Sequence, residues 1–212
     1  ASDVYKRQAQ ILQVRGNFDD CLRLARELSE SYPVFLVNSV NPDRLQGQKT
    51  AAFEVFDALG FAPDLHAMPL GNAGNISAYH LGYREERDIG RINKLPRLWG
   101  IQAAGSAPFI QGSPVAKPET IATAIRIGNP ASWDLAQAAK ADTDGAFGAA
   151  TDKEILWMHR FLSQETGVFV EPSSATGAAG LYKAAKLGQL PKVDSIVAVS
   201  YTHLTLPTNR EV

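Results

Sequence analysis

The stretch Pro69-Leu70-Gly71-Asn72-Ala73-Gly74-Asn75-Ile76 connects an expected strand at 64–69 to an expected helix at about 76–88. Glycine lets the backbone approach a ligand closely and adopt positive φ, and the first amides of a helix lack intrahelical partners. Such a loop at the carboxyl end of a strand is typical of an anion cradle, although a tight turn without a ligand would use the same residues. The pattern matches neither the dinucleotide fingerprint nor the P-loop, so neither a dinucleotide nor a nucleoside triphosphate is indicated.

Strands and helices alternate on both sides of this loop. Helical periodicity and capping signals predict helices at 19–31, 48–59, 151–166 and 173–187, in addition to the one at 76–88. Short apolar runs predict the strands 34–37, 64–69, 97–103, 146–150, 167–172 and 195–198. This alternation predicts an α/β fold with a mainly parallel sheet and helices on both faces.

Composition excludes several classes of protein. The 212 residues are 45% hydrophobic and 20% charged, which is enough apolar surface for a substantial core. A net charge of -1 argues against nucleic acid as a partner, and the absence of an apolar run of about 18 residues argues against a membrane span.

Cysteine and histidine usage adds two expectations. The single cysteine, Cys21, cannot form an internal disulfide, which favours a reducing compartment and hence the cytoplasm; we interpret Cys21 as a small core residue of the 19–31 helix. The four histidines show no metal-ligand spacing, so no metal site is expected.

A second polar cluster follows the expected strand at 34–37. Asn38, Ser39, Asn41 and Arg44 offer amides, a hydroxyl and a guanidinium that suit an anion, although a solvated turn would have the same composition. If this loop and the 71–75 loop follow neighbouring strands, they would face one crevice. The small residues of 171–177 would permit either close approach of a flat ring or plain helix-sheet packing.

The two ends of the chain are related through their codons. One permitted codon choice for Val199–Leu206, read on the opposite DNA strand, encodes the sequence of Ala1–Arg7. We therefore predict that residues 1–8 and 199–212 are translated sequencing-adapter DNA, and we exclude them from fold reasoning. The segment between them is then expected to be an internal or C-terminal fragment of a longer gene product.

Several longer stretches resemble the threonine synthases, a pyridoxal-phosphate-dependent family with the tryptophan-synthase-β type of fold, fold type II. The likeness covers essentially all of residues 9–198. It is carried by Gly16–Cys21, Leu36–Thr50, Pro69–Ile76, Gln102–Gly105, Pro118–Gly128 and Val168–Ala175.

The resemblance implies a fold, a reaction and two sets of binding residues. The implied reaction converts O-phospho-L-homoserine and water to L-threonine and phosphate, with pyridoxal phosphate as electron sink. Residues 9–36 would be a remnant of the smaller N-terminal domain, and residues 37–198 an incomplete large cofactor-binding domain. The full-length protein would be a homodimer. The cofactor phosphate would be held by Gly71, Asn72, Ala73, Gly74 and Asn75, and the substrate phosphate by Asn38, Ser39 and Arg44 with Asn75 nearby.

The sequence also departs from this family. The lysine that carries the cofactor lies in a Ser-Phe-Lys-Asp-Arg-like motif in the family, and no such motif occurs in this chain. Lys49 matches a different family lysine. We therefore assign no catalytic residue and expect the chain as written to be inactive. A threonine dehydratase or cysteine synthase fragment, or a non-catalytic phosphate-binding domain, remain alternatives, although glycine-only phosphate loops are usual in the sibling enzymes.

Overall fold

The computed structural model describes residues 12–16, 18–37 and 41–201, and the chain divides into two units, 1–36 and 37–212. The first unit contains α2 (Phe18–Ser31), which agrees with the helix predicted at 19–31. Leu22 is buried on this helix, whereas Cys21 is exposed, so the prediction of Cys21 as a core residue is wrong. One step along a helix turns the side chain by about 100°, which places Cys21 outside the apolar face.

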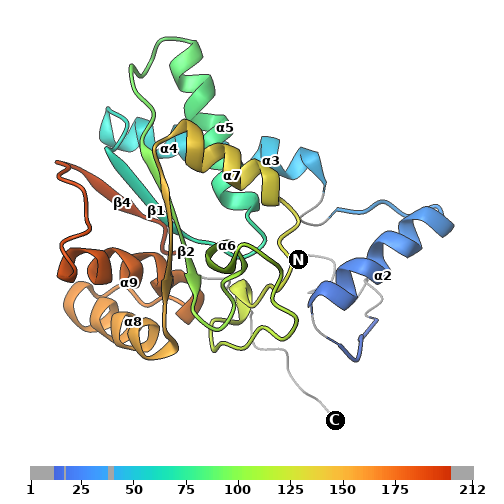
Figure 1. Ribbon diagram of the computed structural model, residues 1–212. Helices are drawn as coiled ribbons and strands as arrows, with labels where there is room; N and C mark the ends of the chain where they lie inside the picture. Colours follow the sequence, from blue (N-terminus) through green and yellow to red (C-terminus); the bar gives the residue numbers. More distant parts are fainter. Residues whose placement is uncertain (1–11, 17, 38–40, 202–212) are drawn as a thin grey trace. The chain divides into compact units, whose positions relative to one another are not determined.

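A four-stranded parallel sheet forms the centre of the second unit (Figure 1). Its strands have the spatial order β3-β2-β1-β4, and the strand of the anion-cradle loop, β1, lies inside the sheet. In the register of the sheet, Leu65 lies opposite Arg97 on one side and Ile196 on the other. The strands are β1 (Leu65–Pro69), β2 (Arg97–Ala103), β3 (Ala146–Ala150) and β4 (Ile196–Ala198).

The four helices predicted for the second unit are present, whereas α3, α6, η1 and α7 were not predicted. The predicted helix at 48–59 is α4, which ends at Gly60 in a left-handed conformation with φ 77°. The predicted capping box between Thr151 and Glu154 begins α8. The helices are α3 (Pro42–Gln48), α4 (Thr50–Leu59), α5 (Gly74–Asp88), α6 (Pro108–Gln111), the 3-10 turn η1 (Thr123–Ile125), α7 (Trp133–Asp142), α8 (Asp152–Thr166) and α9 (Pro172–Lys186).

Helices cover both faces of the sheet, as predicted (Figure 1). On one face, Ile101 of β2 packs in a core cluster with Ile155 of α8 and Ala179 of α9. On the other face, Met68 of β1 belongs to a cluster with residues of α4, α5 and α7, among them Ile76. Because side chains alternate across a strand, β1, β2 and β3 each supply residues to both cores.

Two predicted strands are wrong. Within the described residues, neither 34–37 nor 167–172 pairs with another segment as a strand. Phe35 is 95% exposed, and Phe169 is 72% exposed with its ring edge-on to His159. An apolar run becomes a strand only where a neighbouring strand accepts its backbone hydrogen bonds, and only Val170 of these segments reaches the core.

The end of the sheet extends beyond the segment that we expected to be native. Val199 donates its amide to the carbonyl of Ala67 at 2.9 Å and is buried in the core. Its origin from adapter DNA stays a prediction, because an apolar residue of any origin can continue a parallel pairing.

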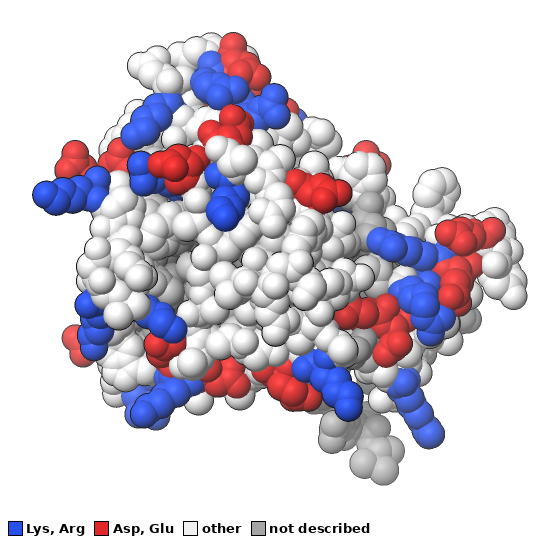
Figure 2. Space-filling view, viewed as in Figure 1, with Lys and Arg blue, Asp and Glu red and all other residues white. Residues whose placement is uncertain are grey.

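The surface charge relates to the prediction against a nucleic-acid partner, and the helix lengths relate to the prediction against a membrane span. Figure 2 shows acidic and basic side chains interspersed on the face in view, with no wide area of one sign. In the part of the chain that the structure describes, no helix combines the length and apolarity required to cross a bilayer.

Candidate phosphate-binding site at the end of β1

The loop 71–75 is held closely against the sheet. The amide of Leu70 donates to the carbonyl of Ile101 at 2.8 Å, which extends the pairing of β1 and β2 by one residue. A Cβ atom at Gly71 would lie 3.0 Å from Cα of Ile125, so only glycine fits there without displacing η1. Ala73 caps α5 with φ 66°, a left-handed conformation that is uncommon for alanine. Strained backbone of this kind concentrates at functional sites.

Asn72 has one anchored end and one free end. Its Oδ1 accepts from the amide of Ala131 at 2.6 Å, and its carbonyl accepts from the amide of Ser132 at 3.2 Å. Because a backbone amide can only donate, the oxygen and nitrogen of this side chain are assigned unambiguously. Nδ2 of Asn72 is buried and has no hydrogen-bond partner among the residues that the structure describes. An orphaned buried donor is costly, and an anionic oxygen in the loop would satisfy it.

The N-terminus of α5 provides further donors. The amides of Gly74 and Asn75 lie in the first turn, where no helical carbonyl is within reach. The side chain of Asn75 serves the loop itself: Nδ2 donates to the carbonyl of Pro69 at 2.7 Å, and Oδ1 accepts from the amide of Ile76 at 2.8 Å. The loop therefore presents backbone amides and the Asn72 amide group, while Asn75 holds its shape.

Helix α3 lies beside this loop. A Cβ atom at Gly74 would be 3.7 Å from Oε1 of Gln48, at the end of α3. Arg44 is exposed on the same helix, so the prediction that it belongs to a loop is wrong. The helix begins earlier than expected because the side chain of Asn41 accepts from the amide of Asp43 and Pro42 occupies the first helical position. Asn38 and Ser39 lie outside the described residues.

The segment after β4 lies against the N-terminal end of α9. Burial raises the pKa of Tyr201, the nearby Glu171 carboxylate raises it further, and the Arg44 guanidinium opposes this rise. The hydroxyl of Ser174 donates to the carbonyl of Tyr201, which fastens the segment after β4 to the first turn of α9.

Lys49, which matches a family lysine other than the cofactor-carrying one, has a local structural role. Its Nζ lies 2.8 Å from Oε1 of Glu85 and 2.6 Å from Oε1 of Gln46. The ion pair joins the start of α4 to α5, and it leaves Lys49 engaged rather than free for chemistry.

Sequence reasoning missed two contributors near the site. Gln102 is fully buried, and its Oε1 accepts from the amide of Phe109 at 2.9 Å. Within the described part of the chain, its Nε2 has no hydrogen-bond partner. A polar residue inside an apolar strand run was the available signal. The amides of Ala131 and Ser132 that anchor Asn72 carried no signal, because a backbone amide has no sequence signature. Among the described residues, no group of acidic, histidine and cysteine side chains could hold a metal ion.

Comparison with known proteins identifies relatives of this chain. Residues 6–201 match a family described as "Pyridoxal-phosphate dependent enzyme". The threonine synthase of Synechocystis sp. is 56% identical over 191 residues, which cover 90% of this chain and 50% of that protein. The threonine synthase of Mycobacterium tuberculosis is 56% identical over 190 residues, covering 89% of this chain and 53% of that protein. The chain thus spans about half the length of the curated relatives it matches.

Solved structures share the fold. Maize serine racemase superposes with a TM-score of 0.75 at 20% identity, covering 97% of this chain and 64% of that one. Threonine synthase from Escherichia coli has a TM-score of 0.70 at 22% identity, covering 91% of this chain and 46% of that one. The predicted fold class is confirmed. Since the family match covers nearly the whole chain, this protein belongs to the pyridoxal-phosphate-dependent enzymes.

Proposed function

We propose that this chain is the cofactor-binding part of a threonine synthase, whose complete protein converts O-phospho-L-homoserine and water to L-threonine and phosphate. The identity of 56% to two threonine synthases supports the reaction. The buried, unpartnered Nδ2 of Asn72 is the observation that carries the binding site.

The residues of the loop fit the phosphate of pyridoxal phosphate. The Asn72 amide group and the first-turn amides of Gly74 and Asn75 are all donors, and no carboxylate belongs to the loop. The positive end of the α5 dipole adds to this attraction. Gly71 and Ala73 would contribute through their backbone. When bound, pyridoxal phosphate supplies an electron sink for the substrate.

Arg44 is our candidate for the second phosphate, that of the substrate. It is exposed on α3, beside the loop, and a guanidinium offers two parallel donors to phosphate oxygens. Asn38 and Ser39 remain candidates from the sequence. We propose that this helix positions substrate phosphate next to the cofactor, with the two anions held by donors from α3 and α5.

Binding of pyridoxal phosphate tests the cofactor site. Asn72→Asp keeps the acceptor for Ala131 and replaces the free donor with a charged oxygen. The matched control is Asn93→Asp at an exposed position. We expect Asn72→Asp to weaken pyridoxal phosphate binding at least about tenfold in calorimetry, since a hydrogen bond to a charged group contributes about 1.5–3 kcal/mol. Pyridoxal, which lacks the phosphate, should bind both variants equally weakly. Equal binding of pyridoxal phosphate to both variants would refute the assigned site.

Substrate specificity requires a separate experiment on the chain with pyridoxal phosphate. Saturation-transfer NMR should detect O-phospho-L-homoserine but not L-homoserine, and Arg44→Gln should abolish the difference while Arg160→Gln, at an exposed position on α8, should not. If the chain binds pyridoxal phosphate but prefers L-threonine, the substrate assignment fails in favour of a threonine dehydratase while the cofactor site stands.

We also propose a location and an assembly for the complete protein. The single cysteine supports the reducing cytoplasm, and the family resemblance supports a homodimer. Analytical ultracentrifugation of the full-length gene product tests the assembly, and a monomer at micromolar concentration would contradict it.

A further inference from the structure

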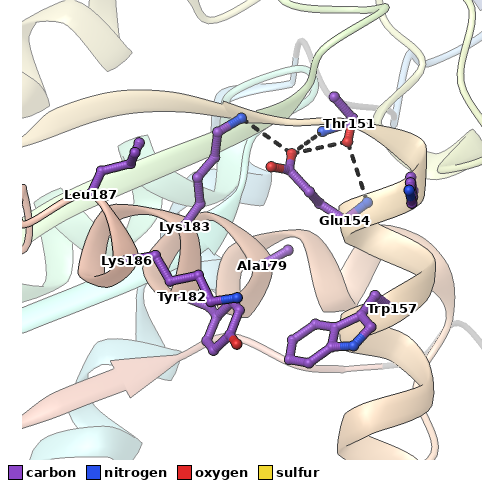
Figure 3. Close-up of a pocket in the computed structure, with 9 residues that line it drawn as sticks. Thr151, Glu154, Trp157, Ala179, Tyr182, Lys183, Lys186 and Leu187 are labelled. Carbon is purple, nitrogen blue, oxygen red and sulfur yellow. Dashed lines mark hydrogen bonds and ion pairs between the residues drawn. The ribbon is translucent and has the colours of Figure 1, made fainter.

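A pocket of about 530 Å³ opens between α8 and α9 (Figure 3). Its volume lies within the range of small-molecule sites in proteins, about 300–1,000 Å³. Its lining comes from α8, the residue before it, α9 and the residue after it, and includes none of the loop 71–75. Neither the predicted cofactor phosphate nor the predicted substrate phosphate accounts for this pocket.

One wall of the pocket is aromatic. The rings of Trp157 and Tyr182 are stacked with their centroids 4.6 Å apart and their planes inclined by 27°. Trp157 is 44% exposed and Tyr182 is 38% exposed, so part of each ring remains open to solvent. Figure 3 shows both side chains at the pocket, one from each helix. Phe161 stacks on Trp157 as well, with centroids 5.2 Å apart, and Nζ of Lys186 lies over the Tyr182 ring, so a ligand meets mainly the exposed ring edges. An aromatic ligand suits such edges, because edge-to-face contacts between rings add to the burial of apolar area.

The charges of the pocket are unbalanced. Lys183 lies 3.1 Å from Oε2 of Glu154 and also donates to the carbonyl of Ala149 at 3.1 Å, so these two charges compensate each other. Lys153 and Lys186 also line the pocket, and in the described part of the chain neither forms an ion pair. Nζ of Lys186 lies 4.6 Å from the centroid of the Tyr182 ring, next to the aromatic wall.

We propose that this pocket binds a small aromatic anion, a carboxylate or phosphate whose ring packs against the exposed edges of Trp157 and Tyr182. The anionic group faces Lys186, with Lys153 contributing to the local potential. A neutral aromatic ligand leaves the uncompensated lysines unmatched, and a non-aromatic anion makes no use of the stacked wall. Only a ligand with both properties complements the pocket in shape and charge.

The test uses 4-nitrobenzoate as the probe and the neutral 4-nitrobenzamide as its matched control. A nitroaromatic ring quenches indole fluorescence on contact, and Trp157 is the reporter, since of the three tryptophans Trp99 and Trp133 do not line this pocket. We expect saturable quenching by 4-nitrobenzoate, at least about fivefold weaker binding of the amide, and loss of the saturable component in Trp157→Phe. Lys186→Gln should weaken binding of the anion about fivefold, as expected for one partly exposed ion pair.

Two further variants separate charge from folding. Lys186→Arg keeps the cation and should retain binding, and Lys192→Gln, at an exposed position outside the pocket, should leave binding unchanged. Equal affinity for the anion and the amide, quenching that rises linearly without saturation, or equal effects of Lys186→Gln and Lys192→Gln would each overturn the proposal. The thermal unfolding midpoint of each variant is measured alongside its binding. If Lys186→Gln unfolds at a lower temperature, the binding of Lys186→Arg decides whether the cation is required.

Discussion

Alanine at Gly82 is expected to separate α4 from α5, the helix that begins at the loop 71–75. A Cβ atom at Gly82 would lie 2.5 Å from the carbonyl oxygen of Lys49 and 2.8 Å from Cβ of Ala52. Neither atom is the flexible end of a side chain, so the helices themselves have to move. Overpacking of this kind costs about 1–3 kcal/mol, and contacts this short belong at the upper end.

The intrinsic preference of alanine for helices acts in the opposite direction. Replacing glycine by alanine within a helix gains about 1 kcal/mol. We therefore expect Gly82→Ala to lower the free energy of unfolding by about 2 kcal/mol, which lowers the melting temperature by about 4–8 °C for a chain of this size.

Gly47→Ala is the matched control, because Gly47 is also helical but has no atom within 4 Å of the added Cβ. It should stabilise the protein by about 0.5–1 kcal/mol. Urea unfolding followed by circular dichroism measures both changes. The reasoning about helix contact fails if Gly82→Ala stabilises the protein as much as Gly47→Ala does.

Two further predictions concern pH and helix capping. Burial lowers the pKa of His66 to about 4, while the unfolded chain protonates near 6.5, so acid favours unfolding: stability should fall by about 2.5 kcal/mol between pH 7 and 4.5. His66→Phe should remove most of this slope in urea titrations at several pH values, and His159→Gln should retain it; an unchanged slope in His66→Phe would contradict the assignment. Thr151→Ala removes the capping box of α8 and should cost about 1 kcal/mol, with faster amide exchange in the first turn of α8. Thr166→Ala, at the opposite end of α8, is the control, and equal effects of the two would argue against a capping role.

Local signals in the sequence predicted most elements because those elements depend on local chemistry. The strand at 97–103 and the strand at 146–150 have the predicted bounds, and the Thr151–Glu154 capping box begins its helix as expected. A capping box satisfies orphan amides within four residues, so the sequence alone contains all its participants. The segments 34–37 and 167–172 have equally apolar sequences but lack strand partners, which no local pattern reveals.

In the candidate site, too, some features are visible in the sequence and others depend on contacts between distant segments. The glycines and asparagines of the loop 71–75 led to the prediction of an anion cradle, because small residues and amide groups before a helix can be recognised in the sequence. The anchoring of Asn72 by the Ala131 and Ser132 amides, and the orphaned Nδ2 that results, arise from backbone groups distant in sequence.

The sequence by itself determined the class of fold and the position of the loop, and it led to the prediction of an anion site there, since these follow from hydrophobic period, turn residues and helix ends. Only the tertiary structure decided which donors stay unpaired, where Arg44 lies, and that α8 and α9 enclose an aromatic, positively charged pocket. Burial and pairing depend on contacts between segments far apart in the chain, and such contacts exist only once the sheet and its helices have assembled.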